Sequence, residues 1–357
     1  MKPSQFMMAL AILAATSCLR GAAPGADMRP SSDAVVVNIN GKQLTLADLE
    51  RKRPGALFQA LTNYYEAQRK TIDEIVDEYV LEQQAQKEGV TVAQLLERHV
   101  NSAIAKDPSE ETLRVYYEGV DTSEPYEAIR VKIIDALRQR RIAKAKTAYV
   151  QSLRAQGSVS IRLAPPRAPI SMTDTPVRGP HDAHVTLLEY ADYECPYCQQ
   201  VQPVIDKLVA EYKGVMAFAY KDYPLPTHAN SQKAAEATRC AGAQGKYWEY
   251  HDLLVSTKQL DPTALKGHAR QLQLDAKAFD RCLDGGEKAE AVKEHFSEAQ
   301  AFGLQGTPTF FVNGRYVSGQ LTYERLRGII EEELGSARRQ AATAANNGPT
   351  GGHSRVP

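Results

Sequence analysis

The sequence predicts two domains, a mainly α-helical domain followed by an α/β domain with a helical insertion. Apolar residues recur at helical spacing through the first half, and strand-like runs alternate with helices in the second half. A proline-rich stretch at residues 164–180 separates the two halves. We place the helical domain at residues 33–164, the linker at 165–178 and the α/β domain at 179–335. The chain's 357 residues are enough for two average domains.

The charge balance argues against two classes of partner. Lys plus Arg equals Asp plus Glu, at 43 each. A nucleic-acid-binding protein, or one that binds an anionic membrane surface, usually carries a basic surplus. We therefore expect no nucleic-acid partner.

Residues 1–26 resemble an export signal. Lys2 precedes the apolar run of residues 6–15, which is shorter than the ~20 residues that span a bilayer but suits a secretory signal. The alternative is a buried N-terminal helix. Cys18 ends the stretch AATSC, which resembles a bacterial lipobox. Cys18 is then either lipidated, which tethers the protein to a membrane, or removed with the signal. Both outcomes place the protein outside the cytoplasm, in the periplasm or cell envelope.

The first half of the helical domain begins with a strand. AVVVNI at residues 34–39 reads as a strand, and the Asn-Gly-Lys of 40–42 reads as its turn. Thr-x-x-Asp at residues 45–48 has the form of a helix start. The apolar pattern then predicts a helix over residues 56–88, which Gly89 ends.

Two shorter helices and one long helix complete this domain. Thr91 and Ser109 are suited to be N-caps of the short helices. The spacing of apolar residues predicts a helix over 126–156, and SVSIRL at 158–163 reads as a second strand. We expect that strand to pair with residues 34–39.

The stretch VVNINGKQLTLADLE resembles the opening of SurA-like peptidyl-prolyl isomerase chaperones. The resemblance covers residues 34–164 and leaves no room for the catalytic parvulin domain, so it does not imply proline isomerisation. It implies a module that holds unfolded clients or pairs two copies of the chain as a homodimer. A structural spacer is the alternative.

The α/β domain contains a Cys-Pro-Tyr-Cys motif. HVTLLEYAD at residues 184–192 reads as a buried strand, and Pro196 then opens a helix with Cys195 at its cap. Backbone N–H groups at a helix N-terminus favour a thiolate, so we expect Cys195 to be the nucleophile. Cys198 lies one turn further and can resolve a mixed disulfide.

Other uses of this motif are less well supported. A zinc site needs two more ligands, and the chain has no second Cys-x-x-Cys. A purely structural disulfide within the motif is the remaining alternative. We expect no metal and no cofactor other than the redox-active Cys195–Cys198 disulfide.

A second motif decides between these alternatives. GLQGTPTFFVNGRYVSG at residues 303–319 predicts a hairpin around Asn313-Gly314, with Thr307-Pro308 directly before it. A strand, a Cys-x-x-Cys helix, a strand, then Thr-Pro, a hairpin and a last helix at 323–334 resemble the thioredoxin fold. With the helical insertion at about 228–301, residues 178–334 resemble the DsbA-like thiol:disulfide oxidoreductases.

The resemblance implies further site residues. Pro308 stands where the family has a cis proline beside the reactive disulfide, and Thr307 precedes it. Glu189 stands at the position of a buried carboxylate that assists proton transfer to the resolving thiol; an exposed strand-end Glu is the alternative. His228, in PLPTHAN, either lines the active-site surface or is an ordinary surface residue.

The two remaining cysteines both lie in the insertion. We expect Cys240 and Cys282 to form a disulfide, as subgroups of the family do, with two free buried thiols as the alternative. Closing that loop stabilises the fold by roughly 4 kcal/mol in the loop-entropy model. We expect residues 336–357, rich in Ala, Asn, Gly and Thr, to be disordered.

The predicted function is transfer of a disulfide to reduced, unfolded exported proteins, with a membrane or soluble redox partner that recycles the centre. We favour an oxidase over an isomerase or reductase of the same fold. The Pro-Tyr dipeptide and Thr-Pro also occur in the isomerase and reductase branch, so direction depends on the reduction potential. A chaperone with secondary thiol chemistry is a third reading.

Overall fold

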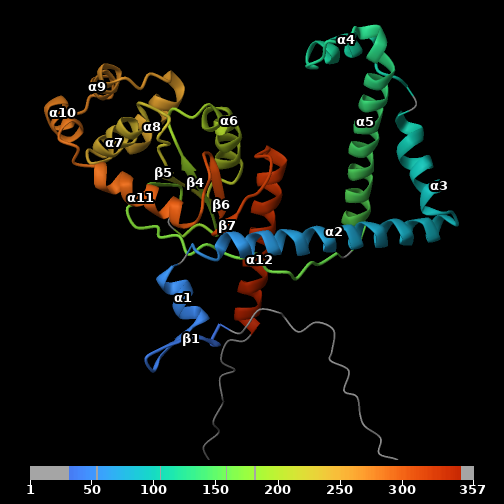
Figure 1. Ribbon diagram of the computed structural model, residues 1–357, viewed down its shortest axis with the longest axis horizontal. Coiled ribbons are helices and arrows are strands. Elements are labelled where there is room, and N and C mark those ends of the chain that lie inside the picture. The colour runs from blue at the N-terminus through green and yellow to red at the C-terminus, as the bar shows by residue number, and fades with distance from the viewer. Residues whose placement is uncertain (1–31, 54, 105, 158, 181, 347–357) are drawn as a thin grey trace, which may run out of the picture. The chain divides into compact units, whose positions relative to one another are not determined.

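The computed structural model describes residues 32–346 except residues 54, 105, 158 and 181. The proposed export signal at 1–26, Cys18, and residues 347–357 of the expected disordered tail lie outside the described residues. The chain forms two compact units, the first ending at Lys52 and the second beginning at Arg53 (Figure 1). No helix in the described part combines the length and the apolar character needed to cross a membrane.

The first unit is a hairpin followed by a short helix. Strands β1 (Val35–Ile39) and β2 (Lys42–Thr45) pair antiparallel. Asn40 and Gly41 form the turn with φ of 50° and 86°, values suited to a tight hairpin. Helix α1 (Leu46–Lys52) begins with a capping box, in which the Thr45 hydroxyl accepts from Asp48 N and the Asp48 carboxylate accepts from Thr45 N.

The prediction that residues 34–39 pair with a strand at 158–163 is wrong. Strand β1 pairs with β2, its neighbour in sequence, because the Asn-Gly turn closes a hairpin locally. Residues 159–163 have no regular secondary structure.

The second unit opens with a group of helices. Gly89, with φ of 66°, ends the first long helix, and Thr91 begins the next with a second capping box. Two small apolar clusters hold the helices together, one around Leu95 and Leu153 and one around Leu113 and Ile129. The segments in chain order are α2 (Phe58–Glu88), α3 (Val92–Leu96), a π-helical turn (Glu97–Asn101), a 3₁₀ turn (Ser102–Ile104), α4 (Glu110–Glu118) and α5 (Tyr126–Gln156).

The first turn of α2 belongs to the core of the α/β domain. Phe58 is buried, and its ring centroid lies 5.9 Å from that of Phe302 and 6.0 Å from that of Phe311. Gly55 lies so close to the Ala301 carbonyl oxygen that an added Cβ would sit 1.6 Å from it, so no larger residue fits there. The helical group is therefore anchored directly on the α/β domain.

Part of the expected linker at 165–178 is also packed. Ala168 is buried, and its N–H donates to the Gly314 carbonyl oxygen at 2.8 Å. Residues Val177–Arg178 form the short strand β3 at the edge of the sheet. This segment packs against one face of the α/β domain. Its proline-rich composition alone did not indicate that it would be packed.

The α/β domain contains a five-stranded sheet in the order β3-β5-β4-β6-β7. The central strand β4 runs parallel to β5 and antiparallel to β6. The long strands alternate between two cores, so that Leu187 faces α6 and Leu188 faces the cluster containing Phe58. The strand bounds are β4 (Val185–Ala191), β5 (Met216–Asp222), β6 (Thr309–Val312) and β7 (Arg315–Tyr316).

Seven helices accompany this sheet (Figure 1). Helix α6 (Pro196–Glu211) links β4 to β5, and α12 (Tyr323–Asn346) follows the hairpin. The insertion between β5 and β6 comprises α7 (Ser231–Gly242), α8 (Tyr247–Thr257), α9 (Pro262–Gln271), α10 (Ala276–Asp284) and α11 (Ala289–Ala301). The last helix continues to Asn346, so the expectation of disorder from residue 336 is wrong for 336–346.

Candidate active site

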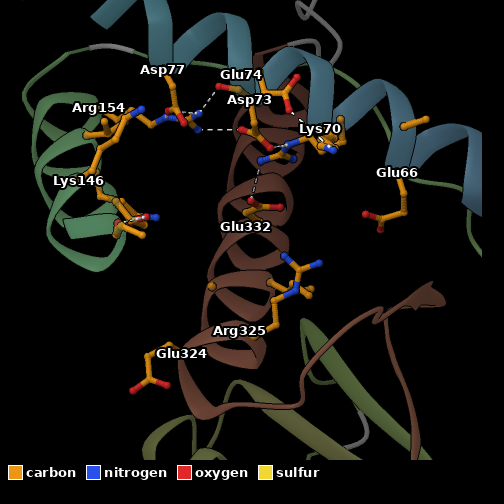
Figure 2. A pocket seen from close by; sticks show the side chains of 18 of the residues that line it. Glu66, Lys70, Asp73, Glu74, Asp77, Lys146, Arg154, Glu324, Arg325 and Glu332 are labelled. Carbon is orange, nitrogen blue, oxygen red and sulfur yellow. Dashed lines mark hydrogen bonds and ion pairs between the residues drawn. The ribbon is translucent and has the colours of Figure 1, made fainter. Parts of the chain in front are cut away.

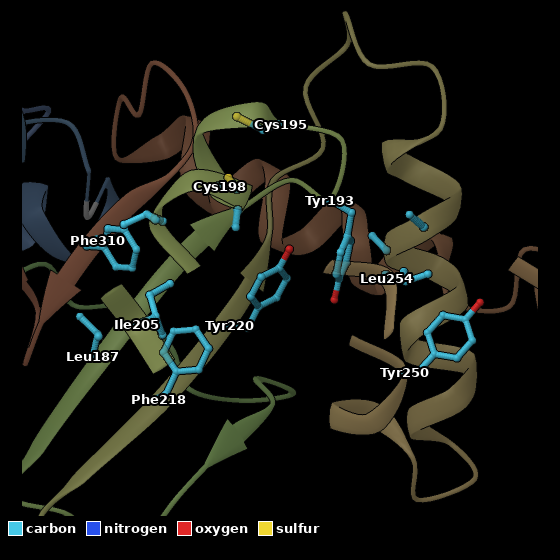
Figure 3. Close-up of a cluster of buried hydrophobic side chains, with 14 of the residues drawn as sticks. Leu187, Tyr193, Cys195, Cys198, Ile205, Phe218, Tyr220, Tyr250, Leu254 and Phe310 are labelled. Atoms are coloured by element: carbon cyan, nitrogen blue, oxygen red, sulfur yellow. The ribbon is translucent and has the colours of Figure 1, made fainter. Parts of the chain in front are cut away.

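The two cysteines of the Cys-Pro-Tyr-Cys motif lie at the start of α6. Cys195 is the N-cap residue and Pro196 the first helical residue, while Cys198 lies one turn further (Figure 3). Both are free thiols and both are buried, whereas Tyr197 between them is 67% exposed. The side chain of Tyr197 therefore faces solvent between the two buried cysteines.

The two thiols differ in acidity. The pKa of Cys195 is lowered to about 5, chiefly because the Cys198 thiol can donate a hydrogen bond to a Cys195 thiolate, and the backbone N–H groups of Cys198 and Tyr197 contribute to this value. Burial raises the pKa of Cys198 well above its usual value. At neutral pH Cys195 is therefore the thiolate and Cys198 the thiol. This division suits a nucleophile and a resolving cysteine.

The Thr-Pro motif lies directly beside Cys195. The Thr307–Pro308 peptide bond is cis, and the Cys195 thiol lies 3.3 Å from the Thr307 carbonyl oxygen, to which it donates. The Thr307 hydroxyl is buried and has no hydrogen-bond partner among the described residues. When Cys195 loses its proton, that hydroxyl is free to donate to the sulfur, and Thr307 lowers the pKa of Cys195.

Glu189 is buried beneath Cys198. It lies on the same face of β4 as Leu187, and burial together with the negative charge of Cys195 raises its pKa to about 8. A cavity of about 10 Å³, roughly the size of one water molecule, is lined by Glu189, Cys198 and Tyr220. Gln199 and Gln202 lie at the same cavity and are only partly buried.

The loop before Cys195 contains a carboxylate that the sequence analysis did not single out. Asp192 has a fully buried side chain, and its Oδ2 lies 2.7 Å from the Nδ1 of His228. His228 is thus held at the loop that precedes Cys195. The signal was available in the sequence, since Asp192 directly follows a buried strand and Cys195 lies three residues further.

The second pair of cysteines is bonded. Cys240 of α7 and Cys282 of α10 form a disulfide across 42 residues, with their Cα atoms 5.9 Å apart. It joins two helices of the insertion and lies outside the motif at α6. Its role is therefore to hold the insertion together.

The described residues contain no cluster of three or more His, Cys, Asp or Glu side chains that could hold a metal ion. A larger pocket of about 1310 Å³ is lined by residues of α2, α5 and α12 (Figure 2), and neither Cys195 nor Cys198 lines it. Several of its charged groups bind one another: Arg154 bridges Asp73 and Asp77, and Arg69 bridges Asp73 and Glu332.

Comparison with known proteins supports the fold of the C-terminal domain. Residues 171–332 match the model of the thioredoxin family. The chain is 36% identical over 200 residues to a protein of Salinispora tropica named as a Na⁺/H⁺ antiporter, NhaA 3, matching 56% of this chain and 30% of that protein. A corresponding protein of Herminiimonas arsenicoxydans is 33% identical over 165 residues, or 26% of its length. The chain spans less than a third of these relatives.

Solved structures of similar fold cover nearly half of this chain. BdbD of Bacillus subtilis is 25% identical, with a TM-score of 0.44 over 46% of this chain and 95% of that protein. A thioredoxin-like oxidoreductase of Silicibacter pomeroyi is 28% identical, with a TM-score of 0.41 over 47% of this chain and 94% of that protein. The prediction of a thioredoxin fold with a helical insertion is confirmed.

Proposed function

We propose that this chain, whose residues 171–332 form a thioredoxin-fold domain of the DsbA-like kind, is a thiol:disulfide oxidoreductase that oxidises cysteine pairs in other proteins. The observation that carries the proposal is the division of acidity between the two thiols at α6. Cys195 is held as a thiolate and Cys198 as a thiol. A stabilised thiolate stabilises the reduced form of the centre, and this makes its disulfide a stronger oxidant.

The reaction begins from the Cys195–Cys198 disulfide. A client thiolate attacks Cys195 Sγ, the Cys195–Cys198 bond breaks, and Cys198 leaves with the electron pair. Cys198 then takes a proton, and neutral Glu189 at the same cavity can supply it. A second client thiolate attacks the client sulfur of the mixed disulfide, and Cys195 leaves as the thiolate. The client gains a disulfide, and the centre gains two electrons.

The centre needs an oxidant to act again. A disulfide-bearing partner protein, soluble or in a membrane, accepts the two electrons by the same exchange in reverse and restores the Cys195–Cys198 bond. The signal-like residues 1–26 support export, which would bring the centre to reduced exported clients in the periplasm or cell envelope. Lipidation of Cys18 would add a membrane tether.

Oxidation of a reduced dithiol peptide, followed by a second assay with a scrambled multi-disulfide protein, tests the proposal. An oxidase forms the peptide disulfide rapidly in its oxidised state and repairs the scrambled protein poorly. Rapid repair by the reduced form, with slow peptide oxidation, would assign isomerase activity instead. The Cys195→Ser variant is the control and should be inactive in both assays.

A second candidate function, client holding, is favoured by an apolar groove on the helical group. The groove, of about 470 Å³, lies between α2 and the end of α5. Ile75 and Tyr79 on its rim are 59% and 61% exposed. Large exposed apolar side chains side by side are typical of a binding surface. The SurA-like resemblance points to the same role, and a second copy of the chain is the alternative occupant.

Replacement of Ile75 and Tyr79 by Ser tests client holding. A groove that holds clients predicts slower oxidation of a large unfolded protein and unchanged oxidation of a short peptide. The matched control replaces Val115 and Val131, which are equally exposed but lie outside the groove. If both double variants oxidise the large unfolded protein at the same rate, the helical group is a spacer and does not hold clients. A change from dimer to monomer would assign the groove to self-association.

A further inference from the structure

The loop between β5 and α7 is tied to the segment that precedes Cys195. Leu225 N donates to Asp192 Oδ2 at 2.7 Å, and Asn230 N donates to Glu194 Oε2 at 2.7 Å. Between these two anchors, His228 Nδ1 lies 2.7 Å from the same Asp192 oxygen. The loop is thus fixed on both sides of the imidazole.

Asp192 also positions the start of α6. Its carbonyl oxygen accepts from Cys195 N at 3.1 Å, and its Oδ1 accepts from Glu194 N at 2.8 Å. The residue that orients His228 therefore also orients the backbone of the nucleophile. Because the carboxylate can only accept, Nδ1 carries a hydrogen in the Asp192 contact, and Nε2 is the nitrogen that gains or loses a proton.

The groups that act on His228 are all acidic. They are Asp192, which bonds to it, Cys195 and Glu194. Partial burial opposes the charged imidazole, but the Asp192 hydrogen bond and the three negative charges together raise the pKa of His228. The side chain is 22% exposed, so a proton can reach it from solvent.

We infer that His228 is a positioning residue of the redox centre: its positive charge, oriented by Asp192, stabilises the Cys195 thiolate, so that reduction of the disulfide is coupled to proton uptake at His228. The inference rests on the proposed function, since it assigns His228 to the same thiol pair. The coupling is reciprocal, as any linkage between two sites must be. The thiolate favours the imidazolium, and the disulfide, which has no charge, favours it less.

The direct test is an NMR titration of the histidine side chains in the disulfide form and in the chemically reduced form of the full-length protein. We expect the His228 midpoint to lie ~0.5–1 pH unit higher in the reduced form, because one nearby negative charge is gained. His184 is exposed and directly precedes β4, whereas Cys195 follows that strand, so His184 is the reference histidine. An unchanged His228 midpoint would overturn the inference.

A second test uses His228→Asn, which keeps a donor for Asp192 and removes the charge. The Cys195 thiolate should form at a pH ~0.5–1 unit higher, and the equilibrium with glutathione should favour the disulfide three- to tenfold more than in the unaltered protein below the His228 midpoint. The difference should disappear at higher pH, where His228 is neutral. His184→Asn should change neither property.

The outcomes separate this inference from the proposed function. The titration needs only that Cys195 and Cys198 form a disulfide, and not that the protein is an oxidase. If the His228 midpoint depends on the redox state but the protein reduces or isomerises disulfides, the inference holds and the proposed oxidase function is wrong. If the protein is a strong oxidant but its His228→Asn variant has the same reduction potential at every pH, the proposed function holds and the inference is wrong.

Discussion

Glu189 and Cys198 line the same small cavity beside α6, where burial and, to a smaller extent, the negative charge of Glu189 raise the pKa of Cys198. Their titrations are therefore coupled. Glu189 is uncharged through the acid half of the pH range, because burial raises its pKa to about 8. A neutral carboxyl beside a leaving sulfur is able to donate a proton, whereas a carboxylate is not. Burial is therefore what keeps Cys198 protonated at neutral pH, and the charge of Glu189 adds to this effect only when Glu189 ionises near pH 8.

The buried carboxyl predicts a pH-dependent stability. Below pH 4.5 Glu189 is protonated in the folded and unfolded chain alike; between pH 4.5 and about 8 only the unfolded chain releases the proton, so the free energy of unfolding falls. Glu189→Gln removes this loss. We expect this variant, with Cys195 and Cys198 reduced, to gain ~3–5 kcal/mol over the unaltered protein in the same state at pH 8 and little at pH 4.5. Urea unfolding at both pH values measures the gain in unfolding free energy. An equal gain at pH 4.5 and pH 8 would contradict the prediction.

Thr307 predicts a change in the acidity of Cys195. Thr307→Val keeps the shape and removes the hydroxyl that can donate to the thiolate, so the pKa of Cys195 should rise by ~1 unit. Absorbance of the thiolate at 240 nm follows the titration. The control is Thr309→Val, whose hydroxyl donates to the Gly306 carbonyl oxygen at 2.7 Å. If the Cys195 thiolate titrates at the same pH in both variants, the Thr307 hydroxyl does not stabilise the thiolate.

Removal of the disulfide in the insertion should lower the stability of the protein without lowering its rate of thiol oxidation. Replacing Cys240 and Cys282 by Ala releases a loop of 42 residues, and the unfolding free energy should fall by ~4 kcal/mol. Oxidation of a short peptide below the new melting temperature should continue at the original rate. If peptide oxidation disappeared while the variant stayed folded, the second disulfide would have a redox role.

The anchoring of α2 predicts that Phe58 stabilises the α/β domain. Phe58→Ala leaves a cavity among Phe302 and Phe311 and should cost ~3–5 kcal/mol. Leu57 precedes it and is 39% exposed, so Leu57→Ala should cost far less. Thermal unfolding of both variants measures the difference. Equal costs would mean that the helical group is not anchored at this point.

Local patterns in the sequence predicted much of the fold and part of the site. The caps at Thr91 and Ser109 and the helix start at Pro196 rest on interactions within four residues, which sequence spacing specifies. The placement of Cys195 and Thr307 in one site, 112 residues apart, came from the resemblance to a known fold. The resemblance also gave Glu189 its expected place as a buried carboxylate, and its side chain is buried.

Other features depend on contacts that no local pattern records. The stretch SVSIRL at 158–163 reads as a strand, but its expected partner at 34–39 already pairs with the neighbouring strand of a hairpin. The docking of Phe58 and of Ala168 joins segments more than 100 residues apart in sequence. The Asp192–His228 pair likewise spans two loops, and a histidine in a loop has no periodicity that reveals its partner.

The equilibrium of the Cys195–Cys198 pair with a series of glutathione buffers tests the central claim most directly. We predict a reduction potential of about −120 mV, the value typical of a strong protein oxidant, because the Cys195 thiolate is stabilised. The measurement should be made with Cys240 and Cys282 intact, so that only the motif at α6 exchanges. A potential of about −200 mV or lower would contradict the oxidase and assign an isomerase or reductase.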